Sequence, residues 1–245
     1  MLKRTGLQMA MKKFLFQNYL SAIRALLFLA SHTRHNISFS LNLLARYSPC
    51  PTRRHWNGVK QIFRYFQGTK DIGLYYTNPS EKILVGFADA GYMSDPHTGR
   101  SQTGYVFTSS NTAISWRSVK QTMTATSSNH AEILAIHEAS RECVWLRSVI
   151  QHIRESCGIS SGQEAPTIIH EDNATCIAQL KDGYIKGDRT KHNLPNFFSL
   201  VTCRRVVTLL FKRFVQADLF TKALPTTTFK KSVHGIGMQR LNELK

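Results

Sequence analysis

The stretch Lys82-Ile83-Leu84-Val85-Gly86-Phe87-Ala88-Asp89 decides the fold. Its apolar and β-branched residues, preceded by Asn78-Pro79-Ser80, predict a short, buried central strand that carries one carboxylate at its end. A carboxylate in such a place needs a cation, a hydrogen-bond donor or water, because burying it alone is costly. The alternative is that Asp89 only opens the turn before Gly91, a role that Asp often takes.

The charge of the chain is strongly positive and unevenly placed. The 245 residues carry a formal net charge of +17. No acid precedes Asp71, whereas that segment holds twelve Lys and Arg, and from Arg189 to Arg240 the only acid is Asp218. The two ends of the chain are thus basic, whereas the middle carries both acids and bases. This distribution predicts a polyanion, most plausibly nucleic acid, as the partner. The alternative is a solvated basic surface without a ligand.

The cysteines and the N-terminal segment bear on the compartment. Five cysteines without a CxxC spacing indicate neither a zinc site nor a disulfide framework, and they favour a reducing compartment. Residues Met1–Ala30 combine basic and apolar residues, as a signal peptide or membrane segment does. Gln17, Asn18 and Arg24 interrupt the apolar run, however, and no clean small-residue cleavage site follows. We therefore expect a cytoplasmic or nuclear protein with no membrane partner, and a secreted basic protein is the outside alternative.

Three helices are predicted at the N-terminal side. Apolar residues recur at helical spacing over Tyr19–Ser31 and Ile37–Tyr47, and a third helix opens after Thr52, its capping residue, and runs through Phe66. The polar side of this third helix is basic. The three helices therefore form either a module that contacts nucleic acid or a plain packing domain.

After Gly68 the pattern changes to strands. Strands are expected over 73–76, 82–88, 104–108 and 113–116, with a hairpin loop at Ser109-Ser110-Asn111. Ser127–Ile153 predicts one long helix, Pro166–His170 a further strand, and Asn173–Leu180 a further helix. This order indicates an α/β or mixed-sheet domain.

Two later acids could join Asp89 at one edge of the sheet. Glu132 stands at the start of the long helix, where Asn129-x-x-Glu132 also has the spacing of a capping box. Asp172 follows a strand, where it could instead cap the next helix. If the three acids converge, hard divalent cations such as Mg²⁺ or Mn²⁺ would neutralise them. Two such ions about 4 Å apart support phosphodiester cleavage.

A series of motifs carries a resemblance to a known family. The motifs are Gly86–Ala90, Arg100–Phe107, Ile114–Gln121, Ser127–Glu132, His170–Asn173, Arg189–His192 and Ala217–Pro225. In this order they resemble the ribonuclease H domain of copia-type retrotransposon Pol polyproteins, over roughly Gly73 to Leu241. Upstream, Tyr19–Ile23, Asn42–Tyr47 and Pro51–Trp56 resemble the end of the reverse transcriptase of the same polyproteins.

The resemblance implies a fold, a chemistry and a site. The fold would be α/β, a ribonuclease H-like mixed sheet flanked by helices (71–245), preceded by a basic helical remnant of the reverse transcriptase (1–70). The activity would be hydrolysis of the RNA strand of RNA–DNA hybrids, with two Mg²⁺, or Mn²⁺, held by Asp89, Glu132, Asp172 and Asp218. Hybrids would be selected by 2′-OH contacts and duplex shape. The residues expected to contact nucleic acid are Arg53, Arg54, Arg100, Lys120, Arg189 and Lys191.

Two departures from the family pattern bear on activity. No Tyr-x-Asp-Asp motif occurs, so we do not expect the chain to copy a template by itself. In the segment 199–216 the family has acids and Gln before Ala-Asp-Leu-Phe, whereas this chain has the run Leu200–Leu210 without any acid. Codons compatible with residues 198–215, read one base over, give a segment close to the family pattern. We therefore interpret 199–216 as aberrant and frameshifted, with loss of the strand that supports Asp218. The alternative to an active nuclease is a catalytically impaired remnant that binds nucleic acid.

Overall fold

The computed structural model describes residues 2–76, 83–159, 166–182, 207–211 and 216–243. The chain forms two compact units. Unit 1 comprises Met1–Leu74 with Met238–Lys245, and unit 2 comprises Tyr75–Gly237. The division lies four residues after the boundary expected at residue 70, and the last eight residues join the first unit rather than the second.

Unit 1 is helical. Its elements are α1 (Leu2–His32), the 3-10 helix η1 (His35–Ile37), α2 (Ser38–Ala45) and α3 (Arg53–Gln67). Thr52 caps α3 as predicted, because its hydroxyl accepts a hydrogen bond from the His55 N–H. Apolar residues of the helices share one core: Tyr19, Ile23, Leu26, Ala30, Ile37, Leu41, Val59 and Ile62. None of the described helices is long and apolar enough to cross a membrane.

A short ribbon joins the end of the chain to unit 1. Strand β1 (Ile72–Leu74) pairs antiparallel with β7 (Met238–Arg240), which the 3-10 helix η5 (Leu241–Glu243) follows. Next to the pair, the Arg240 guanidinium donates to both carboxylate oxygens of Asp71, at 3.0 and 2.7 Å. Both bonds come from Nη1 of Arg240, and they join the last residue of β7 to the residue before β1.

Unit 2 is built on a mixed sheet of β2 (Leu84–Gly91), β3 (Gln102–Ser109), β4 (Thr112–Lys120), β5 (Thr167–Glu171) and β6 (Val207–Phe211). The strand order is β4-β3-β2-β5-β6, so β2 is central, as its sequence predicts. Strands β2, β3 and β4 pair antiparallel, and β5 runs parallel to both β2 and β6. Ser110 and Asn111, with φ of 54° and 64°, form the predicted turn between β3 and β4.

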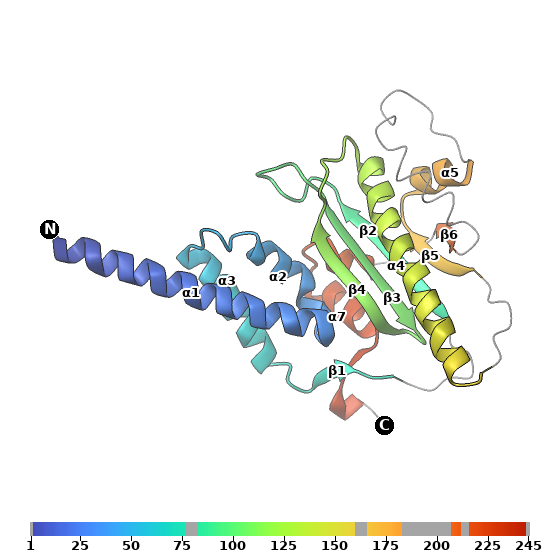
Figure 1. Cartoon of the computed structure of the whole chain (residues 1–245), viewed down its shortest axis with the longest axis horizontal. Helices are drawn as coiled ribbons and strands as arrows, with labels where there is room; N and C mark the ends of the chain where they lie inside the picture. Colours follow the sequence, from blue (N-terminus) through green and yellow to red (C-terminus); the bar gives the residue numbers. More distant parts are fainter. Residues whose placement is uncertain (1, 77–82, 160–165, 183–206, 212–215, 244–245) are drawn as a thin grey trace. The chain divides into compact units, whose positions relative to one another are not determined.

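One helix covers the central strands. Helix α4 (Ser128–Ser156) crosses a face of the sheet over β2 and β3 (Figure 1). The core between them contains Ala88, Tyr105 and Phe107 from the sheet and Ile133, Ile136 and Ala139 from α4. After β5 comes α5 (Ala174–Asp182), and after β6 come the 3-10 helix η4 (Ala217–Phe220) and α7 (Thr226–Gly235).

Two expectations about this sheet are wrong. Asp89 does not end its strand, because β2 continues through Ala90 and Gly91, which pair with Thr103 and Gln102 of β3. The strand expected to be lost within 199–216 is also present, since Val207–Phe211 pairs with all five residues of β5. This run of Val, Thr, Leu and Phe has high strand propensity whatever its origin. Residues 199–206 and 212–215 lie outside the described residues, and the frameshift stays a prediction.

Candidate metal and active site

The parallel pairing of β2 and β5 brings Asp89 and Asp172 together. The register joins Phe87 to His170, whose rings stack at 5.2 Å, and each acid lies two residues further along its strand direction. Asp89 still lies in β2, and Asp172 is the first residue after β5, so the parallel register brings the two acids to the same end of the paired strands. Asp89 is 3% exposed, whereas Asp172 is exposed.

Glu132 reaches the same place from α4. The cap of this helix is Ser127, whose hydroxyl accepts from the His130 N–H, so the capping box expected from Asn129 to Glu132 is wrong. Glu132 is therefore free of a capping role and points into the cluster from within the helix. One oxygen each from Asp89, Glu132 and Asp172 lie within 4.8 Å of one another.

The alternative role considered for Asp172 is also wrong. Asn173 caps α5, since its Oδ1 accepts from the Cys176 N–H at 3.0 Å. The Asn173 N–H in turn donates to Oε1 of Glu171, a buried acid that the sequence reasoning missed. Asp172 therefore does not cap α5, and its carboxylate lies beside those of Asp89 and Glu132.

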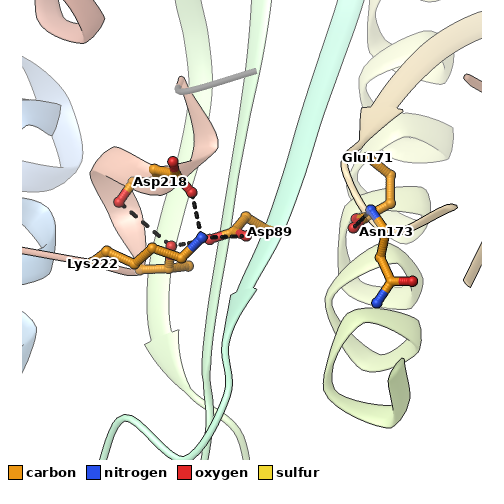
Figure 2. Close-up of polar contacts among 6 residues, drawn as sticks. Asp89, Glu171, Asn173, Asp218 and Lys222 are labelled. Atoms are coloured by element: carbon orange, nitrogen blue, oxygen red, sulfur yellow. Dashed lines mark hydrogen bonds and ion pairs between the residues drawn. The ribbon is translucent and has the colours of Figure 1, made fainter. Parts of the chain in front are cut away.

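The fourth predicted acid, Asp218, lies on the other side of Asp89. Figure 2 shows the Lys222 ammonium between the two carboxylates, 2.5 Å from Asp218 Oδ1 and 3.1 Å from Asp89 Oδ1. The Thr221 hydroxyl donates to the other oxygen of Asp89. Asp218 is not one of the three acids whose oxygens lie within 4.8 Å of one another. The Lys222 ammonium contacts both Asp218 and Asp89. Thr221 and Lys222 were missed as site residues, although the Asp218-x-x-x-Lys222 spacing suits an ion pair.

The segment that carries Asp218 packs on the sheet, although the sequence led us to expect the loss of its supporting strand. A Cβ at Gly104 would lie 2.6 Å from Thr221 Cγ2, and one at Gly91 would lie 2.7 Å from the Thr221 carbonyl oxygen. The Ser118 hydroxyl donates to the Phe220 carbonyl oxygen at 2.5 Å. The two glycines thus allow the backbone after η4 to lie directly on β2 and β3. These contacts do not involve residues 199–216.

The acids perturb one another strongly. Burial raises the pKa of Glu132 to about 10, and the charges of Glu171 and Asp89 add to the effect. Burial raises the pKa of Asp89 as well, although Lys222 and the Thr221 hydroxyl oppose that shift. Burial and the charge of Asp89 raise the pKa of Glu171 well above its ordinary value. Burial alone would lower the pKa of Lys222, but Asp89 and Asp218 outweigh it and raise the value.

The residues present suit a divalent cation. Glu132 Oε2 and Glu171 Oε2 are buried and have no hydrogen-bond partner among the described residues. Unpaired carboxylate oxygens in a buried cluster are the ligands that Mg²⁺ and Mn²⁺ take. A cation at Asp89, Glu132 and Asp172 would also offset the repulsion between carboxylates that, together with burial, raises the pKa of Glu132.

The residues expected to bind nucleic acid are only partly described. Arg53 and Arg54 are exposed on α3 in unit 1, and Arg100 is half-buried in the β2–β3 connection of unit 2. The Lys120 ammonium pairs with Asp95 at 3.1 Å, so part of its charge is neutralised within the chain. Arg189 and Lys191 lie outside the described residues. The assignment of all six stays a prediction.

Comparison with known proteins identifies the family. The Pol polyprotein of transposon TNT 1-94 from Nicotiana tabacum is 30% identical over 224 residues, which are 90% of this chain and 16% of the polyprotein. The Ty1-DR1 Gag-Pol polyprotein of Saccharomyces cerevisiae is 25% identical over 85% of this chain and 12% of its own length. The chain belongs to the Pol polyproteins of copia/Ty1-type retrotransposons. It spans only a small part of these polyproteins.

A third relative of this Pol segment has a different description. The secreted RxLR effector protein 161 of Plasmopara viticola is 39% identical over 130 residues, 52% of this chain and 90% of the effector. No protein-family model matches the chain.

Solved ribonuclease H structures match part of the chain. RNase H1 from Halobacterium salinarum matches with a TM-score of 0.41 and 13% identity, over 56% of this chain and 93% of that protein. LC11-RNase H1, solved in complex with an RNA/DNA hybrid, matches with a TM-score of 0.40, 16% identity and the same coverage. With its mixed sheet in the order β4-β3-β2-β5-β6 and α4 across it, this Pol segment has the predicted ribonuclease H-like fold, and the helices of unit 1 precede it.

The raised pKa of Glu132 predicts how stability depends on pH without divalent ions. Between the ordinary value of 4.5 and about 10, the folded protein keeps a proton that the unfolded chain has released. The free energy of unfolding should therefore fall as pH rises through this window, by on the order of 1–3 kcal/mol between pH 5 and 8. Glu132→Gln should reduce that slope in urea denaturation with EDTA, and the exposed Glu155→Gln should keep it. A Glu132→Gln slope equal to that of the unsubstituted protein would contradict the burial of a titrating acid.

Proposed function

We propose that this Pol segment is a ribonuclease H that hydrolyses the RNA strand of RNA–DNA hybrids with divalent metal ions. The observation that supports it best is that one oxygen each of Asp89, Glu132 and Asp172 lie within 4.8 Å of one another. These residues come from β2, from α4 and from the position directly after β5. A copia/Ty1-type Pol family and a ribonuclease H-like fold make RNA–DNA hybrid the substrate to expect.

Each residue has a physical task in this proposal. Asp89 belongs both to the cluster with Glu132 and Asp172 and to the contact with Lys222. The hydrogen bond from the Thr221 hydroxyl fixes the orientation of its carboxylate. Glu132 offers a buried oxygen without a competing hydrogen bond, and Asp172 offers an exposed one on the side open to a substrate. When bound, divalent ions would supply a metal-activated water and would stabilise the leaving oxygen. The chain holds the acids in place for this before any substrate binds.

A second candidate is a catalytically impaired Pol remnant that binds nucleic acid. The observation in its favour is the Lys222 ammonium, which pairs with two of the four predicted acids. The net charge of +17 would support binding in either case. For location we keep the proposal of a cytoplasmic or nuclear protein. The effector relative, secreted by its name, makes secretion the alternative to test.

Loss of one acid should abolish cleavage. Asp89→Asn and Asp172→Asn each remove a negative charge from the proposed metal site, so Mg²⁺-dependent cleavage of a labelled RNA–DNA hybrid should fall by at least about 100-fold. The measurement is the initial rate of RNA-strand cleavage resolved on a denaturing gel. Glu155→Gln, which removes an exposed charge on α4, should leave the rate unchanged. Equal rates for the Asp89→Asn and Glu155→Gln proteins would refute the site.

Binding to hybrid should weaken steeply with salt. Lys and Arg that neutralise phosphates release counterions, so the logarithm of the affinity should fall linearly with the logarithm of the salt concentration. The measurement is fluorescence anisotropy with labelled hybrid in EDTA, which prevents cleavage. The double substitution Arg53→Gln and Arg54→Gln should reduce the slope by about one to two units. A flat dependence would leave the basic flanks as solvated surface only.

A further inference from the structure

The Lys222 ammonium stands where a cation between two acids would stand. It contacts Oδ1 of Asp89 and Oδ1 of Asp218 at once, and these carboxylates come from β2 and from η4. An ordinary ion pair four residues apart on a surface would involve Asp218 alone. Contact with Asp89, whose side chain is only 5% exposed, shows that the ammonium reaches into the acid cluster.

Hydrogen bonds and close packing of the neighbouring residues fix the position of Lys222. Lys222 follows Thr221, which is 1% exposed and whose hydroxyl is bonded to the other oxygen of Asp89. The Lys222 N–H donates to the Asp218 carbonyl oxygen at 2.9 Å, which closes a turn and sets the lysine above that acid. Because Gly91 and Gly104 have no Cβ atoms, Thr221 can lie directly against the sheet at these two positions. The same chain segment therefore supplies Asp218 and the cation that neutralises it.

Charge decides what can share this position. Two carboxylates at short range need a counter-charge, and a single ammonium supplies it without dehydrating a metal ion. An ammonium and a divalent cation on the same oxygen of the buried Asp89 carboxylate would repel each other. Asp89 Oδ1 can therefore serve Lys222 or a metal ion on the Asp218 side, but not both.

We propose that Lys222 is a built-in cation that fills the position between Asp89 and Asp218. The chain then takes up one divalent ion, at Asp89, Glu132 and Asp172, and Asp218 is held by the lysine instead of a second ion. This inference rests on the proposed metal site. The side chain of Lys222 is 44% exposed, so its removal opens the second position to solvent and to a metal ion.

The test is a titration of the full chain with Mn²⁺. Electron paramagnetic resonance measures the free ion, and the number of bound ions follows by difference from the total. The unsubstituted protein should bind one Mn²⁺, Lys222→Met two, and Lys222→Arg one because the positive charge remains. Lys230→Met, a matched exposed lysine on α7, should leave the count at one. Asp218→Asn should also leave it at one, and Glu132→Gln should abolish binding. Circular dichroism establishes that each variant is folded.

The counts separate this inference from the proposed function. Two ions in the unsubstituted protein, with one lost in Asp218→Asn, would overturn the role of Lys222 and leave the metal-dependent nuclease standing. One ion in both the unsubstituted protein and folded Lys222→Met would do the same. No bound ion in any of these proteins would overturn both. If Lys222→Met does not fold, the unsubstituted and Asp218→Asn counts still decide between one ion and two.

Discussion

The structure of unit 2 depends on how it offsets buried negative charge. Asp89, Glu132 and Glu171 are all buried and lie near one another where β2, α4 and β5 meet. Burial and mutual repulsion both favour the protonated acids, so the apo cluster destabilises the fold unless cations are present. Lys222 supplies one positive charge at the Asp218 side. The opposite side, at Glu132 and Asp172, has no such cation among the described residues, and it is there that a divalent ion would stabilise the protein most.

The second constraint is the close contact between the sheet and the segment after η4. Gly91 and Gly104 lack the Cβ atoms that would push the Thr221 backbone away, and Ser118 holds the Phe220 carbonyl. The Asp218–Lys222 segment is therefore held by contacts with β2, β3 and β4. An aberrant 199–216 sequence would alter the edge of the sheet at β6 without removing these contacts.

Much of the fold was predictable because its signals are local. The apolar run before Asp89, the Ser110-Asn111 turn and the unbroken apolar period of α4 each indicate one structure whatever surrounds them. The family motifs then predicted which acids belong together. The caps were harder, since Ser127, Asn129, Asp172 and Asn173 are all good capping residues and only the backbone geometry selects Ser127 and Asn173. Lys222 could not be predicted, because its contact with Asp89 joins residues 133 positions apart and an Asp four residues before a Lys is common.

The central claim is that Asp89, Glu132 and Asp172 form one divalent-cation site in a ribonuclease H-like Pol segment. The most direct measurement is an anomalous difference map from crystals of the protein grown with Mn²⁺. The account predicts a peak in contact with one oxygen from each of the three acids, with the Lys222 ammonium still between Asp89 and Asp218. A map without a peak at the three acids, in crystals where their side chains are well ordered, would contradict it.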